Sequence, residues 1–142
     1  MKKFKVNIDN KSYEYVEGTR YFDIAKEHNE KALLVKVNGK LQELYKNLKS
    51  DIDLEFITLK DSIGRMTYER SAILILLKSI KDIYGNTIKP VVEFSTGNGL
   101  YIRLNVKDDF DIDRIDGRMR EIVDENLRIE KMNVHTETAI KM

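Results

Sequence analysis

The sequence lacks several features on which whole classes of function depend. Its 142 residues include no cysteine, so the chain can form no disulfide and offers no thiolate as a metal ligand or nucleophile. The longest apolar run, Ala72 to Leu77, falls far short of the roughly 20 residues that a membrane-spanning helix needs. The start, Met1 to Lys5, is followed by polar alternation and not by the apolar segment of a secretion signal. We therefore expect a cytoplasmic chain with no membrane partner.

The sequence also lacks an excess of charge of either sign. It has 25 Lys and Arg against 24 Asp and Glu, so no global positive field attracts the phosphates of nucleic acid. A local basic patch is compatible with this balance. Hydrophobic residues make up 42% and charged residues 35% of the chain, which is typical of a globular protein with a buried core. The length suits one ordinary domain or two small ones.

Alternating apolar and polar residues predict a compact β-rich module in the first part of the chain. The alternation begins at Phe4, and Asn38-Gly39 is the dipeptide best suited to the positive φ angles of a tight hairpin. Thr19 is expected to cap a short helix that ends near Asn29. The expected elements are strands at 4–8 and around 13–15, a helix at 19–29, and strands at 33–37 and 54–58. This order of strand, strand, helix, strand, strand indicates a β-grasp module.

A second module is expected after the polar stretch 60–65, which contains Gly64 and predicts a linker. Thr67 is expected to cap a long helix with one wide apolar face, and Gly85 to end it. Asp111 is expected to cap a second helix. The other expected elements are a β-hairpin around 91–104, an extended segment at 129–135 and a helical start at 136–140. Because this last pattern stops soon after it begins, we expect a piece of a longer protein.

The first module carries a recognisable set of residues: Gly18-Thr19, Ile24-Ala25, Val37-Asn38-Gly39-Lys40-Leu41, Leu44, Leu48 and Leu54 to Thr58. With these, residues 1–62 resemble a TGS domain, the ubiquitin-like β-grasp module at the front of threonyl-tRNA synthetases. Residues 66–142 are similar to the first half of the synthetase's second domain, through Arg70-Ser71-Ala72, Asn98-Gly99-Leu100-Tyr101 and Arg118-Met119. The resemblance implies an α+β fold: a TGS domain at 1–62, then a partial editing-like α+β domain (helix, β-hairpin, helix, strand) at 66–142, truncated at its C-terminus.

The segments Tyr68-Glu69-Arg70-Ser71 and Gly99-Leu100-Tyr101 also resemble the N-terminal region of bacterial nucleoside kinases of the uridine kinase type. That version carries Arg-Ser where the synthetase has His-Ser. It implies that an ATP-dependent kinase domain follows as a partner in the same chain, because no Gly-x-x-x-x-Gly-Lys-Ser/Thr loop is present here. We expect a non-catalytic accessory or regulatory region that binds nucleotide, RNA or another domain. The alternatives are a fragment of a threonyl-tRNA synthetase or tRNA-editing hydrolase, and a protein-interaction module.

No resident metal or cofactor is expected. In the synthetase, two histidines one helical turn apart face the editing cleft, and the resemblance puts Arg70 and Leu74 at those positions. The two histidines of this chain, His28 and His135, fall in different modules and are expected at a helix end and a strand end. The stretch 97–99 is expected to form a hairpin turn and not a phosphate loop, since strands flank it on both sides. The acidic stretch 109–116 lacks the glycine and glutamate of a calcium loop, with Arg114 at the glycine position.

Two groups of candidate binding residues remain. Arg70 could hold a carboxylate or phosphate bidentately, with Tyr101 as a second ligand-binding candidate; the alternative for Arg70 is an ion pair with Glu69 or Asp61 at the helix start. The second group could form a basic, aromatic-bearing patch for RNA phosphates and bases, or merely a solvated lysine face. Its members are Lys36, Lys40, Tyr45, Lys46 and Lys49.

Overall fold

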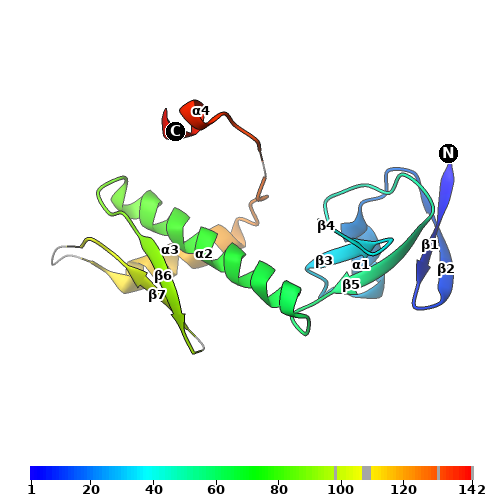
Figure 1. Cartoon of the computed structure of the whole chain (residues 1–142), viewed down its shortest axis with the longest axis horizontal. Coiled ribbons are helices and arrows are strands. Elements are labelled where there is room, and N and C mark those ends of the chain that lie inside the picture. The colour runs from blue at the N-terminus through cyan, green and yellow to red at the C-terminus, as the bar shows by residue number, and fades with distance from the viewer. Residues whose placement is uncertain (98, 107–109, 131, 142) are drawn as a thin grey trace. The chain divides into compact units, whose positions relative to one another are not determined.

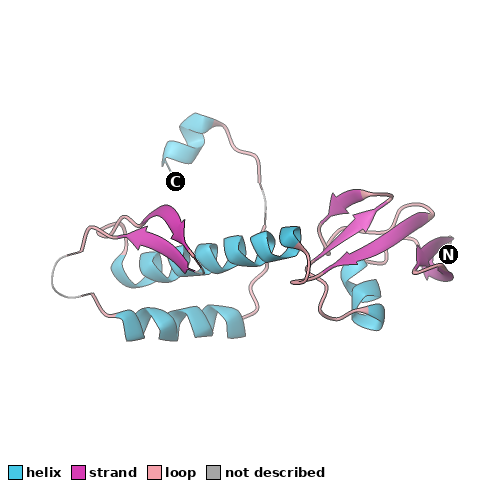
Figure 2. Cartoon of the chain, turned by 60° about the horizontal axis from the view of Figure 1, so that its bottom comes forward, coloured by secondary structure: helices cyan, strands magenta, loops and turns pink. Residues whose placement is uncertain are grey.

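The chain forms two compact units, Met1–Ile73 and Leu74–Met142 (Figures 1 and 2). The structure, a computed structural model, describes residues 1–97, 99–106, 110–130 and 132–141. Unit 1 contains β1 (Lys3–Ile8), β2 (Lys11–Val16), α1 (Tyr21–His28), β3 (Leu34–Val37), β4 (Lys40–Gln42), β5 (Ile52–Ile57) and the start of α2 (Ser62–Tyr84). Unit 2 contains the rest of α2, β6 (Val91–Thr96), β7 (Gly99–Arg103), α3 (Ile112–Asp124) and α4 (Thr136–Lys141). This content is compatible with the predicted α+β class.

A mixed five-stranded sheet forms the frame of unit 1. Its strand order is β2-β1-β5-β3-β4, with β1 parallel to β5 and all other neighbours antiparallel. Along β1 the side chains alternate between exposed and buried, as expected for a strand with one face in the core. The core beneath the sheet joins α1 to β1, β3 and β5 through Phe4, Val6, Ile8, Tyr21, Ile24, Val35, Leu48, Ile52 and Leu54. The predicted order of strand, strand, helix, strand, strand is present, and the short strand β4 is an addition to it.

The β3–β4 hairpin turns at Asn38-Gly39, as the sequence predicts. Both residues have positive φ angles, 49° and 78°, which is the conformation that a two-residue hairpin of this hand requires. Asn38 also ties the turn to β5: its Oδ1 accepts a hydrogen bond from the Asp53 N–H at 2.8 Å, and its own N–H donates to the Asp53 carbonyl at 2.9 Å. The turn is thus fixed by its own backbone and by the neighbouring strand.

Helix α2 begins at Ser62, so two details expected from the sequence are wrong. The stretch 60–65 is not a linker throughout, and Thr67 does not cap the helix, because its hydroxyl donates to the Ile63 carbonyl one turn earlier at 2.8 Å. Asp61 starts the helix instead, since its carbonyl accepts from the Arg65 N–H and its carboxylate accepts from the Thr58 N–H at 2.8 Å. The assignment of domains to 1–62 and 66–142 stays a prediction.

Gly64 explains why a helix can begin in so polar and glycine-bearing a stretch. It is buried, and a β-carbon at this position would overlap the carbonyl group of Thr58. The first turn of α2 therefore packs directly onto the backbone that follows β5. Glycine here permits a close approach of two backbone segments within unit 1 and does not mark a flexible joint.

Unit 2 is held together by contacts between α2 and α3, which run alongside each other in Figure 2. Arg118 of α3 donates to Asp82 of α2 at 3.0 Å, and the Tyr84 ring stacks on Phe110 with centroids 5.7 Å apart. The Tyr84 hydroxyl also accepts a hydrogen bond from the Asp111 N–H at 2.9 Å. Ile80, Ile115 and Ile122 are buried. The predicted hairpin is present as β6 and β7, paired from Val91–Arg103 to Thr96–Gly99.

The strand expected at 129–135 is not formed. The described residues on either side of 131 have no strand assignment and are exposed, because no neighbouring strand offers them hydrogen bonds. His135 therefore does not end a strand; it precedes α4, and its carbonyl accepts from the N–H groups of Thr138 and Ala139. The helical start expected at 136–140 is present as α4. In the described part of the chain, no helix is long and apolar enough to cross a membrane.

Candidate functional site

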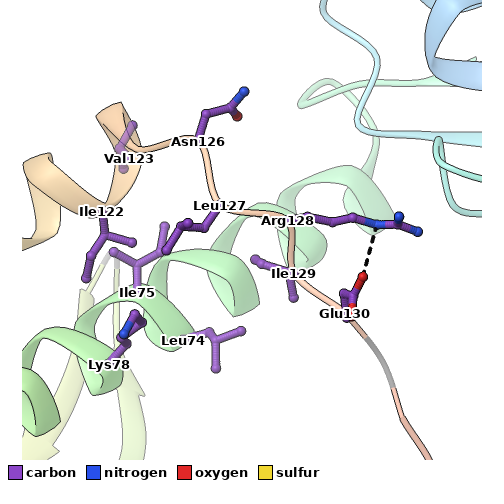
Figure 3. A pocket seen from close by; sticks show the side chains of 10 residues that line it. All are labelled: Leu74, Ile75, Lys78, Ile122, Val123, Asn126, Leu127, Arg128, Ile129 and Glu130. Carbon is purple, nitrogen blue, oxygen red and sulfur yellow. Dashed lines mark ion pairs between the residues drawn. The ribbon is translucent and has the colours of Figure 1, made fainter.

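An apolar groove of about 490 Å³ in unit 2 is lined by α2, by α3 and by the segment that follows α3 (Figure 3). Leu74 and Ile75 of α2 form one wall, and Ile122 and Val123 of α3 form another. The segment that follows α3 completes the groove with Leu127 and Ile129. The groove is open to solvent: Leu74 is 47% exposed and Leu127 is 53% exposed.

The side chains of this groove offer little for catalysis. Lys78, Arg128 and Glu130 supply its charges, and the Arg128 Nε lies 3.8 Å from the Glu130 carboxylate (Figure 3). Leu74 occupies the position at which the synthetase resemblance puts a histidine, and an aliphatic side chain can neither bind a metal nor transfer a proton. Among residues 1–97, 99–106, 110–130 and 132–141, no group of three or more His, Asp or Glu side chains is arranged to hold a metal ion.

Arg70 does not line the groove. It lies in the part of α2 that belongs to unit 1, its side chain is exposed, and neither of the ion pairs considered for it, with Glu69 or Asp61, is formed. Within the described residues its guanidinium makes no hydrogen bond or ion pair. A cation without a partner on an exposed helix face is accessible to an anion, although no second side chain beside it completes a site.

Tyr101 lies on β7 in unit 2, so the two candidate ligand-binding residues belong to different units. Its ring stacks on Phe94 of β6 with centroids 5.0 Å apart and an interplanar angle of 14°, and about half of it is exposed. Arg103 and Glu93 form an ion pair on the same hairpin. Cross-strand stacking of this kind stabilises a two-stranded sheet, which accounts for the position of Tyr101.

The candidate RNA-binding residues are only partly brought together. Tyr45 and Lys46 lie in the loop beside the start of α1, where the Tyr45 ring stacks on Phe22 at 5.9 Å. Lys26 Nζ and the Arg20 guanidinium lie 5.4 Å and 5.8 Å from the centre of the Phe22 ring. The result is a cluster of two aromatic rings and three cations on one side of unit 1.

The other three lysines do not belong to this cluster. Lys36 of β3 pairs with Glu55 of β5 at 3.6 Å, and the alternation along β3 puts it on the face of the sheet opposite to buried Val35. Lys40 begins β4 at the hairpin turn, and Lys49 lies in the loop before β5. All five candidates remain predictions.

His28 belongs to an aromatic cluster that the sequence does not reveal. It is the last residue of α1, as expected, and its Nε2 lies 2.7 Å from the Tyr15 hydroxyl, which donates to the Glu27 carboxylate at the same distance. Tyr13 and Phe56 contact the imidazole with ring centroids 4.4 Å and 6.4 Å away. Burial, together with the hydrogen bond to Glu27, raises the pKa of Tyr15 well above its usual value. This cluster fixes the end of α1 onto β2 and β5.

Arg118 forms ion pairs with three carboxylates in unit 2, and the sequence does not reveal this network. Its guanidinium contacts Asp82 on α2, Glu121 on α3 and Glu125, which follows the last residue of α3, at 2.9–3.0 Å. Hydrogen bonds from Lys78 and from Arg118 hold the pKa of Asp82 below its usual value. The spacing of Arg118 and Glu121 was readable as a helical pair, but the partner on α2 depends on tertiary packing.

Fold and groove together define a two-unit α+β protein with an apolar cleft, without a metal centre or a nucleophile assembled among the residues described. No family model matches the chain. It is 33% identical to threonine–tRNA ligase from Clostridium tetani over 147 residues, which covers 94% of this chain and 22% of the ligase. The corresponding enzyme from Thermotoga petrophila is 32% identical over 151 residues, and that from Thermotoga maritima is 32% identical over 148 residues.

The chain is therefore homologous to threonine–tRNA ligases over most of its length. It spans about a fifth of the length of these relatives. The homology supports the predicted resemblance to the front region of such an enzyme. It gives no support to the nucleoside kinase context, which was the main expectation from the sequence.

Proposed function

We propose that this chain is a non-hydrolytic accessory region of the threonine–tRNA ligase type, which binds tRNA and does not cleave an aminoacyl ester. In this proposal unit 1 contains a TGS domain of the β-grasp fold and unit 2 is part of an editing-like domain. The order β2-β1-β5-β3-β4, with a parallel central pair and α1 against one face, supports the β-grasp assignment.

The observation that carries the proposal is the composition of the groove in unit 2. Homology extends through both units. At one position in this groove the resemblance puts a histidine, but the side chain is that of Leu74, beside Ile75 and Ile122. Ester hydrolysis needs a group that activates water or stabilises the developing oxyanion. Aliphatic side chains do neither, so this groove is suited to holding a ligand without acting on it.

A deacylation assay tests the hydrolytic part of the proposal. The chain is incubated with threonine tRNA charged with serine, and the release of serine is followed over time. We expect the rate to equal that of spontaneous hydrolysis in buffer. Hydrolysis that rises in proportion to the concentration of the chain would contradict the proposal and indicate an editing hydrolase.

Direct binding tests the tRNA part. Because the chain is nearly neutral, only a few lysines can contact phosphates, and we expect weak binding that falls steeply with added salt. Fluorescence anisotropy of labelled tRNA at several salt concentrations measures this. An absence of binding at low salt would refute the tRNA part, whatever the deacylation assay shows.

The second candidate function, the accessory region of a nucleoside kinase, rests on the sequence resemblance alone, and its anion-binding part can be tested at Arg70. Arg70 replaces a histidine of the synthetase, and its exposed guanidinium has no partner among the residues described, so it is available to an anion such as a phosphate. Calorimetric titration with uridine nucleotides and ATP tests this. An anion site would lose about 1.5–3 kcal/mol of affinity in Arg70→Ala. Finding no affinity for these ligands in the wild type, or equal affinity in both forms, would remove the anion site.

A further inference from the structure

The hairpin of β6 and β7 is a sheet of only two strands in the described part of the chain, so each strand has one open edge. Large apolar side chains on both strands are exposed: Val91 by 44%, Phe94 by 54%, Leu100 by 41% and Tyr101 by 48%. A two-stranded sheet is at best marginally stable in water, whereas three or more strands with an apolar face can be stable. The hairpin therefore has both the free backbone groups and the apolar surface to accept another strand.

The two open edges are protected to different degrees. Pro90 directly precedes β6, and the pairing shifts register between Val92 and Phe94, so that Glu93 has no residue opposite it on β7. A proline, a bulge and a charge are among the features by which an edge avoids pairing with another strand. Strand β7 has neither proline nor bulge, and its one charged residue, Arg103, is neutralised by an ion pair with Glu93. The edge of β7 is therefore the one at which a further strand can be added.

The sequence of β7 complements itself in an antiparallel pair centred on Tyr101. In this register Tyr101 lies opposite Tyr101 of a second copy, and Leu100 lies opposite Ile102 of that copy, twice over because of the two-fold axis. Arg103 lies opposite Gly99. The two Arg103 residues are then about 13 Å apart along the strands, beyond the Debye length of about 8 Å at physiological salt. No like charges meet, and every apolar side chain of the strand opposes another.

We propose that β7 pairs with β7 of a second copy of this chain, which joins the two hairpins into a four-stranded antiparallel sheet. The two-fold arrangement closes on itself, so it stops at a dimer and leaves the two β6 edges outermost. Two strands of five residues form a small interface, and interfaces that bury less than about 1,200 Å² belong to weak, transient pairs. We therefore expect an equilibrium of monomer and dimer that shifts with concentration. This inference does not rest on the proposed tRNA binding.

Sedimentation velocity of the whole chain tests the pairing, at concentrations rising to about 1 mM, where a weak dimer becomes measurable. Leu100→Lys puts a charge opposite Ile102 at two places in the dimer, and the loss of two cross-strand pairs should weaken the association about 2- to 30-fold. The matched control is Ser95→Lys. Ser95 lies directly opposite Leu100 on β6, so this variant adds the same charge to the other strand of the hairpin and should dimerise as the wild type does.

Hydrogen exchange of the wild-type chain gives a readout that needs no substitution. In an antiparallel ladder, alternate N–H groups of β7 point away from β6. These amides should exchange more slowly at high protein concentration than at low, while the outward amides of β6 should exchange at the same rate in both. Thermal melting followed by circular dichroism identifies any variant that has lost its fold, and if Leu100→Lys is unfolded, the exchange rates of the wild type decide.

The outcomes either support this dimer or overturn it. Slower exchange of β7 amides at high concentration, with selective loss of the dimer in a folded Leu100→Lys, supports it. A chain that stays monomeric up to about 1 mM overturns it and leaves the β7 edge to a different polypeptide. A dimer that Leu100→Lys leaves intact, that Ser95→Lys disrupts instead, or that gives β7 no protection places the contact elsewhere and also overturns it.

Discussion

Substituting alanine for glycine is expected to have opposite effects on stability at two helical positions. Gly64, in the first turn of α2, has the Thr58 backbone against the position where a β-carbon would be, whereas Gly117, inside α3, has open space there. A methyl group at 64 forces the helix away from the residues after β5. At 117 it only restricts the unfolded chain and improves helix propensity. Whether Gly→Ala raises or lowers the stability therefore depends on the atoms around the glycine and not on its being in a helix.

We predict that Gly64→Ala lowers the free energy of unfolding of unit 1 by about 1–3 kcal/mol, the usual cost of overpacking. Gly117→Ala, its matched control, should raise that of unit 2 by about 0.5–1 kcal/mol. Urea denaturation followed by circular dichroism measures both. Equal stabilisation by the two substitutions would mean that α2 does not approach Thr58 as described.

The lowered pKa of Asp82 predicts how the stability of the fold depends on pH. Hydrogen bonds from Lys78 and Arg118 lower this pKa in the folded chain, so the carboxylate contributes stability above the ordinary aspartate pKa and loses it as pH falls through the lowered value. Asp82→Asn should therefore melt at a lower temperature than the wild type at neutral pH. The difference should shrink below about pH 4, where the unfolded aspartate is protonated.

The control for this prediction is Asp113→Asn, an acid of α3 that makes no hydrogen bond or ion pair in the described part of the chain. Its melting temperature should follow that of the wild type as pH falls through this range. A constant difference between Asp82→Asn and the wild type from neutral to acid pH would show that the ion pairs of Asp82 do not stabilise the fold.

At the scale of elements, the stability of α3 depends on the residue that precedes it. Asp111 caps it, as the sequence predicts, with the carboxylate accepting from the Arg114 N–H at 3.1 Å. We predict that Asp111→Ala destabilises unit 2 by about 1 kcal/mol, the typical loss for a helix cap, while Asp111→Ser keeps most of the stability. Thermal melting checks this. A loss of the same size in Asp111→Ser would point to another role for the carboxylate.

Elements governed by neighbouring residues could be predicted, and those governed by distant ones could not. The alternation from Phe4 and the dipeptide Asn38-Gly39 act within a few residues, so β1 and the β3–β4 turn follow from the sequence. The start of α2 could not be predicted from the sequence. Gly64 in its first turn is explained only by its packing on the backbone of Thr58. The strand expected at 129–135 fails for the same reason, since an extended pattern needs a partner that sequence alone does not supply.

The candidate sites divide in the same way. Tyr45 and Lys46 were identifiable as a basic aromatic pair, but Phe22 and Lys26 join them only through the fold. The groove of unit 2 brings Leu74 together with Leu127, which are distant in the sequence and carry no chemical signal of their own. Apolar residues that follow no regular spacing in the sequence cannot be recognised as one surface until the packing of the helices is known.

For the whole molecule, the first site of proteolysis is not expected at 60–65, because α2 begins at Ser62 and covers most of the linker predicted there. Arg65 lies within the helix, its N–H donates to the Asp61 carbonyl, and its guanidinium donates to the Lys60 carbonyl at 3.0 Å. Arg128 lies in an irregular exposed segment. We predict that trypsin cleaves after Arg128 before it cleaves after Arg65, because cleavage requires a locally unfolded backbone. Mass spectrometry of the early fragments measures the order, and an initial cut at Arg65 would support the linker expected from the sequence.

The Asn38-Gly39 turn has a consequence for the chemical ageing of the protein. An asparagine followed by glycine is the pair most prone to deamidation, because the small glycine lets its backbone nitrogen attack the side-chain amide. In the folded chain the Asn38 amide oxygen is held by the Asp53 N–H, so the group is kept away from that reaction. Deamidated protein would therefore accumulate mainly from molecules in which the sheet has opened. The isoaspartate that forms adds a backbone carbon to a two-residue turn, so each damaged molecule would be hindered from closing its hairpin again.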